Sequence, residues 1–485
     1  DVNSTPNNPL TVPPSAILPN TTIAMAFANA NDLNRATSAI VQHIAGVANQ
    51  TQAYDIYNLD GSFDNQWNGE IYNGCINNLQ VLIDQYSTTS PAYSGIAKLE
   101  MAYVFSMAAD VWGDVPYSQA GQGLKYETPR FDKVEDIYQG NAALGITSLF
   151  DLVKSGLADL AKPGILTPGK DDLVYGGDLA KWSRMGNTLL LKFAIMLTNK
   201  NPVLAKSTIE SVLTGNNYIN SNLLDFEVPF GSSVGNRNPI FDFNNNLRTT
   251  DQMLSSRLLA LSRSLNDTVR LAKFFTKPLL PGGTTGTPTF VAFNNGSTAA
   301  APKISIKVAP FDYVLRSKYN TYLTGTLEPL VIQATGGQAP IRLLTNFQVN
   351  FILAEAALVL GTAGDPNAYY QEGIKASMQK VGMTTAEIDT FFVNNPTVVT
   401  LAGTPDEMLQ QIITQKYIAW IGNGIEAFDD YRRTGYPVLA LPLNAAGDNP
   451  NVIPTRLPYT PAELARNPNA PSPRPKTDVK LWWAK

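Results

Sequence analysis

The sequence predicts a mainly α-helical protein, an α/α superhelix of tetratricopeptide-like helix pairs with a loop-rich insert that carries short strands. Two observations predict this class. Apolar residues recur at three- and four-residue spacing over long stretches, as in helices that bury one face. Residues 216–344 largely lose this periodicity and contain short alternating runs and Gly-Thr-Pro loops. The consensus residues of the tetratricopeptide repeat are not recognisable, so the prediction rests on the pairing of the helices.

The segment 96–120 contains the helix around which the others are expected to pack. Up to Asp110 it is apolar on almost every face, and a helix that is apolar all round lies between other helices. Gly113 and Pro116 then end the helix, because both residue types disfavour its continuation. The chain must therefore turn where Trp112 and Tyr117 require burial.

The remaining helices follow from periodicity and from capping residues. Residues 67–86 form the clearest amphipathic helix, and a short Ser-Pro connection joins it to the central helix as a hairpin. Asp178 is an N-cap for a helix over 179–199. Thr404 and Glu407 make a capping box for a helix that ends near Trp420. Further helices are expected over 31–48, 134–160, 202–213, 251–264, 345–360, 367–381 and 426–432.

Four kinds of segment result from these elements. Residues 1–20 contain several prolines and few apolar anchors, and are expected to be an extended leader. Residues 21–215 and 345–436 form the helical scaffold, and residues 216–344 form the irregular insert. The proline-rich residues 437–485 form a coil-like tail that packs on the scaffold.

The composition excludes several classes of function. The 485 residues carry a net charge of −4, without the basic stripe of a nucleic-acid-binding protein. Cys75 and His43 are the only residues of their types, so a disulfide framework, a His/Cys zinc site and a histidine-based triad are excluded. No cofactor is expected and no metal-ligating residue is assigned, but whether the binding site uses a metal ion cannot be read from the sequence. No apolar run reaches the length of a membrane span, and no signal peptide is present, so the chain is cytoplasmic or its leader has been removed.

Two irregular segments carry the candidate ligand-binding residues. Aromatic and polar side chains on loops held by a rigid scaffold are typical of ligand-binding sites. The candidates combine these types in the loop 54–67 and in the insert: Tyr54, Asp55, Tyr57, Phe63, Asp64, Phe241, Asn244, Arg248 and Tyr313. The alternative interpretation is that each of these aromatic residues fills a gap under a long loop.

Other conspicuous residues are expected to be structural. The tryptophans of the helical segments and of the Trp482–Trp483 pair are assigned to the core. Residues 426–433 contain acidic and basic side chains that are expected to tie the last helix to its neighbours, and Glu355 should be paired. Asp110 and Asp114 are close enough to suggest a glycosidase pair, but Asp110 ends a buried helix. His43 is expected at the surface or in a cap.

Several stretches resemble one family, the SusD/RagB-like outer-membrane glycan-binding lipoproteins of Bacteroidota, in its SusD-like branch. The residues that carry the resemblance occur in family order: the N-terminal DVNSTPNNP, then 93–120, 177–197, 346–361 with 369–378, 415–437 and the final LWWAK. The resemblance implies a stack of four tetratricopeptide-like helix pairs. It also implies a lipid anchor on a cysteine upstream of Asp1, on the extracellular face of the outer membrane, and a TonB-dependent β-barrel transporter as partner.

The resulting hypothesis is a cell-surface lipoprotein that captures an oligo- or polysaccharide and delivers it to the transporter, without catalysing a reaction. The first alternative is a peptide- or protein-binding helical-repeat surface protein of the same fold. A glycan-degrading enzyme is a more remote alternative. The bound glycan cannot be read from the sequence, because aromatic platforms accept many sugars.

Overall fold

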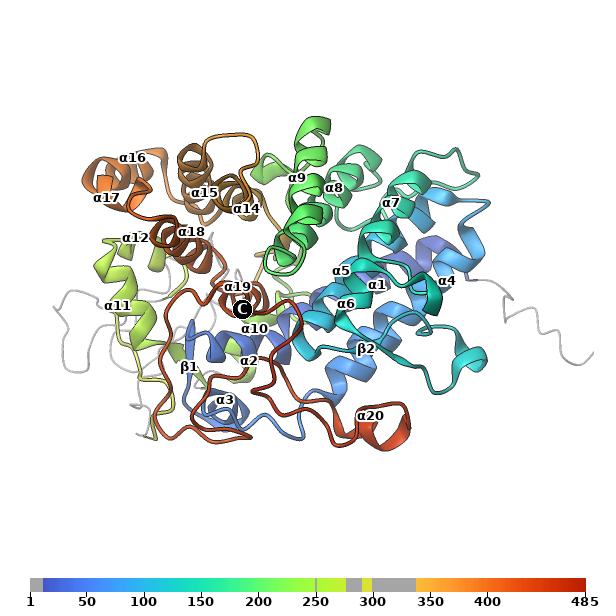
Figure 1. The fold of residues 1–485 in the computed structure, drawn as a ribbon, viewed down its shortest axis with the longest axis horizontal. Helices are drawn as coiled ribbons and strands as arrows, with labels where there is room; N and C mark the ends of the chain where they lie inside the picture. The colour runs from blue at the N-terminus through green and yellow to red at the C-terminus, as the bar shows by residue number, and fades with distance from the viewer. Residues whose placement is uncertain (1–11, 249–250, 276–289, 299–336) are drawn as a thin grey trace, which may run out of the picture.

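The computed structural model describes residues 12–248, 251–275, 290–298 and 337–485, and within them the predicted fold class is confirmed (Figure 1). The α-helices of these residues are α1 Pro14–Ala30, α2 Asp32–Ile40, α3 Asn49–Asp55, α4 Asn77–Tyr86, α5 Pro91–Trp112, α6 Val134–Gln139, α7 Leu149–Leu160, α8 Leu179–Met196, α9 Pro202–Gly215, α10 Pro239–Asp242, α11 Ser256–Ser264, α12 Thr268–Leu271, α14 Asn346–Val359, α15 Pro366–Lys380, α16 Thr385–Asn394, α17 Pro396–Val399, α18 Pro405–Ala419, α19 Gly424–Thr434 and α20 Pro461–Arg466.

Shorter and rarer elements complete the described chain. Two are π-helices, η1 Asn65–Ile76 and η5 Phe243–Leu247, and three are 3₁₀ turns, η2 Gly123–Tyr126, η3 Ala142–Leu144 and η4 Asn222–Leu224. The strands form antiparallel two-stranded ladders: β1 Ile44–Gly46 with β5 Gln252–Leu254, β2 Val115–Pro116 with β3 Phe131–Asp132, and β4 Phe226–Val228 with β6 Ile341–Leu344.

The helices pack in a continuous series from one end of the molecule to the other. In the first half, α4 packs on α5, α5 on α7, α7 on α8 and α8 on α9. The second half begins where α14 contacts α8, and continues through α15 and α18 to α19. Helix α19 packs on α2, so the last helix of the scaffold contacts one of its first helices.

The central helix α5 behaves as its composition predicts. Every residue from Met101 to Trp112 is buried, and α5 contacts α4, α7, α8 and α19. Gly113, with φ of +95°, ends the helix in a conformation that disfavours a side chain. The turn brings the Trp112 indole to the C-terminal tail, where its Nε1 donates to the Pro458 carbonyl at 3.0 Å.

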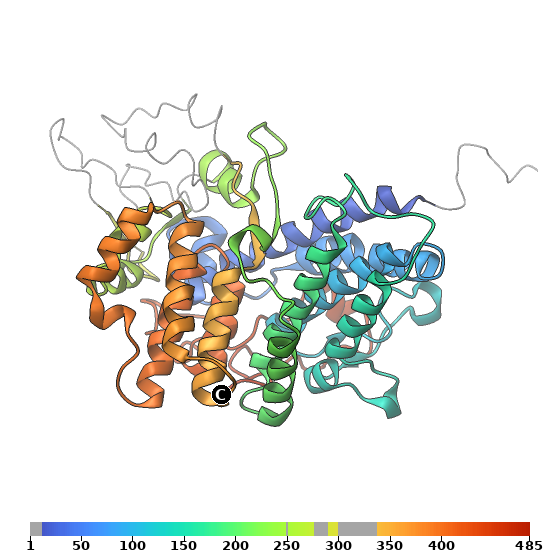
Figure 2. The same cartoon turned by 90° about the horizontal axis from the view of Figure 1, so that it is seen from above.

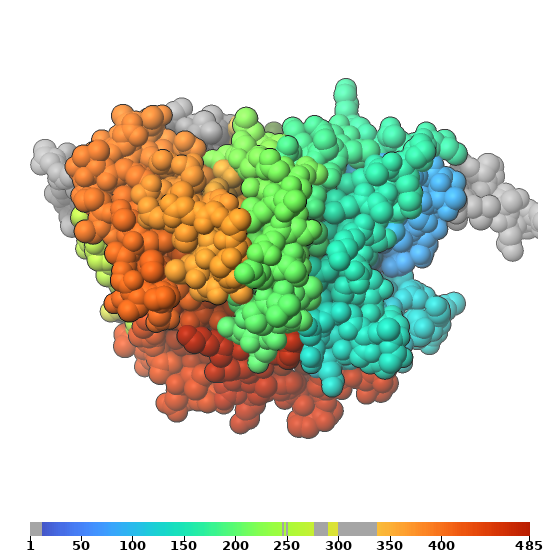
Figure 3. Space-filling model, turned by 45° about the horizontal axis from the view of Figure 1, so that its top comes forward, coloured from blue at the N-terminus to red at the C-terminus, as the bar shows by residue number. Residues whose placement is uncertain are grey.

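The tail 437–485 packs along one side of the helical stack (Figures 1 and 3). Leu457 N donates to the Val111 carbonyl at 2.9 Å, and the Tyr459 hydroxyl donates to the Asp114 carbonyl at 2.5 Å. Near the end of the chain, the guanidinium of Arg432 lies 4.7 Å from the Trp483 ring centroid. The tail therefore covers the end of α5 and the outer side of α19.

The charged residues of α19 form the predicted structural network. Arg433 Nη2 lies 2.8 Å from Glu355 Oε2 and 2.8 Å from Asp430 Oδ1, which joins α19 to α14. Lys192 of α8 pairs with Glu426 at 2.5 Å. These side chains are almost completely buried, so the network links three helices in the interior.

The N-terminal segment differs from its prediction. Residues 1–20 are expected to be extended, but helix α1 begins at Pro14 and contains Pro19. Pro14 occupies the first turn, where a missing N–H costs nothing. The apolar side of α1 packs against η1, α4 and α5, and this tertiary burial outweighs the low helix propensity of the segment.

Three other helix predictions are wrong in extent. The expected helix over 251–264 begins only at Ser256, because Gln252–Leu254 form strand β5. The expected helix over 134–160 is divided into α6 and α7, because Gly140 and Gly145 adopt φ of +80° and +68°. The expected helix over 31–48 ends at Ile40, and residues 44–46 pair instead with β5 of the insert. Helix α16, whose Thr384 and Glu387 form a capping box, is not among the predicted helices.

His43 is also misplaced by the sequence prediction. It is 1% exposed, its ring lies 4.2 Å from that of Tyr417, and its Nε2 is 2.9 Å from the Tyr417 carbonyl. Because a carbonyl only accepts, Nε2 carries the proton. Burial lowers the pKa of His43 to about 3.

Among the described helices, none is both long enough and apolar enough to cross a lipid bilayer.

Seen from above, the described part of the insert around α10 lies against α1, on the side of the molecule away from the C-terminus (Figure 2).

Candidate functional site

A cavity of about 410 Å³ lies where the N-terminal helices meet the insert. We call it the charged pocket, because acidic and basic side chains line it from both sides. Its wall on the scaffold side comes from α1, α2 and η1, and its other wall comes from α10, η5 and the residues before them. The lining residues are Phe27, Asn31, Asp32, Arg35, Asn65, Gln66, Glu70, Gly235, Arg237, Pro239, Asp242, Phe243 and Leu247.

Both walls of the charged pocket contain a π-helix. Asn65, Gln66 and Glu70 come from η1, and Phe243 and Leu247 come from η5. In η5 the Arg248 amide donates to the Phe243 carbonyl five residues earlier, at 2.8 Å. Segments of π-helix are rare and are frequently found at functional sites. The i→i+5 pattern also places residues five apart, such as Asn65 and Glu70, on the same face of η1, and both line the cavity.

Asn31 lies at the junction of α1 and α2 and is oriented toward the pocket. An asparagine before a helix usually accepts a hydrogen bond from the first turn. Here the side chain makes no cap, and its Nδ2 donates to Glu70 Oε1 at 2.6 Å. The other carboxylate oxygen of Glu70 is buried without a partner in the described residues. The Asn31–Glu70 pair therefore places an acceptor group at the pocket wall at the expense of a helix cap.

Arg35 connects the two walls of the pocket. On its own helix it pairs with Asp32, and its Nε donates to Asp32 Oδ1 at 3.1 Å. Its guanidinium lies 4.1 Å from the ring centroid of Phe243 on η5. A guanidinium over a ring face is a stabilising cation–π contact. This contact fixes both the orientation of Arg35 and the position of η5 against α2.

Partly exposed apolar groups border these charges. The Phe27 ring lies 6.1 Å from that of Phe230 in an edge-to-face arrangement, and both rings are half-buried. Phe243 is half-buried, and Leu247 is 67% exposed. The pocket thus combines phenyl faces with guanidinium, amide and carboxylate groups.

Burial changes the protonation of the pocket. Desolvation raises the pKa of Glu70 to about 7, and the nearby carboxylate of Asp32 acts in the same direction. Glu70 is therefore partly protonated near neutral pH, and can donate as well as accept a hydrogen bond. Burial also raises the pKa of Tyr54 well above its ordinary value, again with a contribution from Asp32. Tyr54 consequently stays neutral beneath the Asp32–Arg35 pair.

The predicted aromatic residues of the loop 54–67 lie in the interior. Tyr54, Tyr57 and Phe63 are at most 3% exposed, and the rings of Tyr54 and Phe63 stack at 5.5 Å. Their burial agrees with the alternative interpretation that aromatic residues fill the space under the loop. As placed, these rings offer no face for a sugar.

The two acidic candidates of the same loop hold neighbouring segments. Asp55 is 1% exposed and accepts from Asn295 Nδ2 at 2.6 Å and from the Gly296 amide, which anchors residues 290–298 of the insert. Its burial raises its pKa to about 7. Asp64 accepts from the Ala462 amide at 3.2 Å and so fixes the start of α20.

The candidates of the insert lie beside the charged pocket. Phe241 is buried, and Asn244 is buried with its Nδ2 donating to the Ile240 carbonyl at 2.9 Å. Arg248 is exposed and directly follows η5. Tyr313 lies outside the described residues. The structure therefore brings the two predicted segments together, but their neighbours Asn65, Gln66 and Phe243 line the cavity.

Sequence reasoning missed the residues at the α1–α2 junction. Asn31, Asp32 and Arg35 lie in the predicted helix over 31–48, which has the pattern of an ordinary amphipathic helix, and Phe27 precedes it. The sequence feature that could have indicated this wall is Glu70, a carboxylate in the first half of the predicted helix 67–86. The direction in which its side chain points can be assigned only when η1 is known to be a π-helix.

Other kinds of site find less support in the described residues. These residues contain no group of three or more His, Cys, Asp or Glu side chains arranged to hold a metal ion. Asp110 is completely buried and both of its carboxylate oxygens accept from the Tyr138 hydroxyl at 2.9 Å. The carboxylate of Asp114 accepts from the Val134 amide at 3.0 Å. Both groups hold the turn after α5.

Comparison with protein families identifies one match. The profile of a SusD-like family, described as starch-binding and associating with the outer membrane, matches residues 6–460. No curated protein sequence matches the chain.

Solved structures resemble the whole chain. One, described as a chitin-binding protein, has a TM-score of 0.76 and 22% identity, with 97% of this chain and 100% of that chain covered. A SusD/RagB family protein from Bacteroides thetaiotaomicron has a TM-score of 0.76 and 23% identity, covering 98% and 99%. A chitin-binding SusD homologue from Flavobacterium johnsoniae has a TM-score of 0.70 and 21% identity, covering 97% and 98%. At these identities the likeness establishes the fold alone.

Proposed function

This chain belongs to the SusD-like family, and from that premise we propose that it binds an oligo- or polysaccharide in the charged pocket without catalysing a reaction. The observation that carries the proposal is the grouping of Phe243, Arg35 and Asn31 with two carboxylates in one cavity between scaffold and insert. The description of the family names starch binding and no reaction.

The chemistry of the pocket suits a saccharide. A pyranose has apolar C–H faces and a rim of hydroxyls that both donate and accept hydrogen bonds. The half-buried phenyl rings of Phe27 and Phe243 can contact the C–H faces. Arg35 and Asn31 donate, while Asp32 and Glu70 accept. Asp32 and Arg35 already form a pair, so their side chains are oriented before the ligand binds. This reduces the conformational entropy lost on binding.

The nature of the glycan is a second part of the proposal. Two of the structural neighbours are described as chitin-binding, and the family as starch-binding. We therefore propose a β-linked N-acetylhexosamine polymer or an α-glucan as the first ligands to test.

Affinity electrophoresis on a panel of polysaccharides tests the binding site. We expect retardation of the wild-type chain by at least one glycan and a weaker retardation of Phe243→Ala by the same glycan. A matched control is Tyr126→Ala, because Lys125 lies 5.1 Å from the Tyr126 ring outside the pocket. Equal retardation of Phe243→Ala and wild type would mean that the glycan binds outside the charged pocket. Binding of peptides alone would favour the peptide-binding alternative, and release of shortened products would favour an enzyme.

We further propose delivery of the glycan to a TonB-dependent β-barrel transporter, with the chain held at the extracellular face of the outer membrane by an N-terminal lipid. These steps rest on the family resemblance and on the association with the outer membrane in the family description. Co-purification from the native membrane with a barrel encoded by the neighbouring gene tests the partner. Purification of the lipidated chain without any barrel, under detergent conditions that preserve such complexes, would contradict it.

A further inference from the structure

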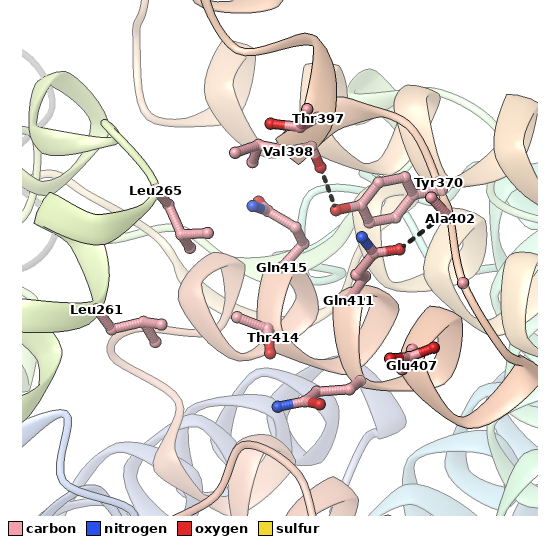
Figure 4. Close-up of a pocket in the computed structure, with 12 residues that line it drawn as sticks. Leu261, Leu265, Tyr370, Thr397, Val398, Ala402, Glu407, Gln411, Thr414 and Gln415 are labelled. Atoms are coloured by element: carbon pink, nitrogen blue, oxygen red, sulfur yellow. Dashed lines mark hydrogen bonds between the residues drawn. The ribbon is translucent and has the colours of Figure 1, made fainter.

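A second cavity, of about 560 Å³, lies on the opposite half of the scaffold between α11, α17 and α18 (Figure 4). We call it the amide pocket. Leucine side chains of α11 face a row of glutamine and threonine side chains on α18. The lining residues are Leu261, Leu265, Tyr370, Thr397, Val398, Ala402, Gly403, Glu407, Gln410, Gln411, Thr414 and Gln415. None of them lines the charged pocket.

The side chain of Gln415 lies at the floor of this cavity in a fixed orientation. Arg270 Nη2 donates to Gln415 Oε1 at 2.6 Å. A guanidinium cannot accept a hydrogen bond, so the oxygen of the amide must face Arg270 and its nitrogen must face away from it. Arg270 is itself completely buried and held by Asp267 and by Ser377 Oγ at 3.1 Å.

The amide nitrogen of Gln415 has no hydrogen-bond partner among the described residues, although Gln415 is only 1% exposed. Figure 4 shows this side chain directed into the space between Leu265 and Val398. A buried donor without a partner costs about 1–3 kcal/mol. Such a cost at the floor of a cavity points to a ligand that brings an acceptor.

The other polar groups of the pocket limit the ligand further. The Tyr370 hydroxyl donates to the Val398 carbonyl at 2.7 Å, and Gln411 Oε1 accepts from the Ala402 amide at 3.1 Å. Glu407 Oε2 accepts from the Thr404 amide at 2.7 Å in the capping box of α18. These three acceptor atoms are therefore engaged. The Gln411 nitrogen lies on the cavity side of its amide, opposite the Ala402 bond (Figure 4).

The pocket thus offers amide donors beside an apolar wall, and the one carboxylate that lines it is engaged in a helix cap. A carbonyl next to a methyl group matches this arrangement, with its oxygen on Gln415 Nε2 and its methyl against Leu261 and Leu265. A cavity of this size holds a ligand of one or two sugar rings. We propose that the amide pocket is a second saccharide site, specific for the acetamido group of an N-acetylated sugar.

This site is independent of the charged pocket, so the test is done on a Phe243→Ala background that removes the first proposed site. The probes are N,N′-diacetylchitobiose and cellobiose, which share a β-1,4-linked disaccharide skeleton and differ in the acetamido groups. Isothermal titration calorimetry measures both. We expect diacetylchitobiose to bind, and cellobiose to bind at least about tenfold more weakly, about 1.4 kcal/mol.

Two variants locate the binding in the amide pocket. Gln415→Glu keeps an acceptor for Arg270 but replaces the free donor with a carboxylate oxygen, so it should abolish binding of diacetylchitobiose. Leu265→Trp, at the half-buried position directly after α11, fills the cavity and should do the same without touching Arg270. Leu223→Trp, at a position 88% exposed, is the control and should bind as the parent does.

Three results would overturn the proposal: no binding of diacetylchitobiose, equal binding of cellobiose, or binding unchanged in both Gln415→Glu and Leu265→Trp. Equal binding of N-acetylalanine methylamide would overturn the assignment to a sugar in favour of a peptide. Thermal unfolding of each variant shows whether it is folded, and Leu265→Trp decides the outcome if Gln415→Glu is not. Weaker glycan retardation of Phe243→Ala alone bears only on the charged pocket.

Discussion

The guanidinium of Arg35 lies 4.1 Å from the ring centroid of Phe243, and this contact joins α2 of the scaffold to η5 of the insert. The two residues are more than two hundred positions apart in the chain, yet they form opposite walls of one cavity. Arg35 is therefore both a ligand-facing donor and part of the link that positions the insert.

The coupling between these residues can be measured. We expect Arg35→Met and Phe243→Leu each to lower the free energy of unfolding, and the double variant to lower it by less than the sum, with a coupling of about 0.5–1 kcal/mol. Urea denaturation of the four proteins gives the cycle. A coupling of zero would mean that the contact contributes nothing to the attachment of η5.

The affinity for glycan should depend on pH through Glu70. Its pKa of about 7 reflects burial, and a ligand that excludes more water disfavours the charged form further. Affinity should therefore fall as pH rises through 7. Glu70→Gln should remove this dependence, whereas Asp84→Asn, at an exposed position of α4, should retain it. Calorimetric titrations between pH 5.5 and 8.5 (roughly the window in which such a group titrates) would show a flat wild-type profile if Glu70 takes no part.

The stability of the fold should depend on pH through Glu100. This carboxyl is completely buried in α5 and accepts from Thr22 Oγ1 at 2.7 Å and from Thr21 Oγ1 at 3.1 Å. Burial raises its pKa to about 8 in the folded chain, above its value in the unfolded chain. Its contribution is therefore fully present below pH ~4.5 and is lost as pH rises through ~8, by on the order of 4 kcal/mol.

Replacement of Glu100 by Gln tests this direction. Glu100→Gln removes the titrating group, so its free energy of unfolding should improve relative to wild type as pH rises from about 5 to about 8. Glu135→Gln, at an exposed position, should follow wild type over the whole range. Urea midpoints at several pH values measure the difference. A constant difference between Glu100→Gln and wild type would contradict a raised pKa.

Removing only Arg433 from its buried pair with Glu355 should lower the free energy of unfolding strongly, whereas replacing both residues should lower it less. Arg433→Met leaves Glu355 uncompensated in the interior, and such a change costs about 3–5 kcal/mol. The double variant Arg433→Met/Glu355→Met should recover part of this loss. Lys154→Ala, in a surface pair that is about two-thirds exposed, should change stability by less than about 1 kcal/mol. If the double variant is no more stable than Arg433→Met, the loss of stability comes from Asp430 and its neighbours and not from the unpaired Glu355.

Predictions from the sequence succeeded where the signal is local. The N-cap at Asp178, the capping box at Thr404, the end of the central helix at Gly113 and the burial of Trp67 and Trp112 all follow from neighbouring residues. The network around Arg433 was also predictable, because charges within an apolar helix need partners wherever they lie.

Predictions failed where partners distant in sequence decide the outcome. Pro14 begins a helix because α1 buries its apolar side on α5, and residues 44–46 form a strand because residues 252–254 pair with them. His43 is buried because Tyr417 covers it. The candidate residues of the loop 54–67 were selected by type, and type does not reveal which ring faces inward.

The sequence by itself determined the helical class, the series of helices on either side of an insert, and the two segments that meet at the charged pocket. Only the tertiary structure decided which side chains line that pocket. The physical reason is that helix formation and capping depend on residues a few positions apart, whereas exposure depends on what packs against a residue. The i→i+5 geometry of η1 and the contact of Arg35 with Phe243 are set by that packing, and they turn Glu70 and Phe243 toward the cavity.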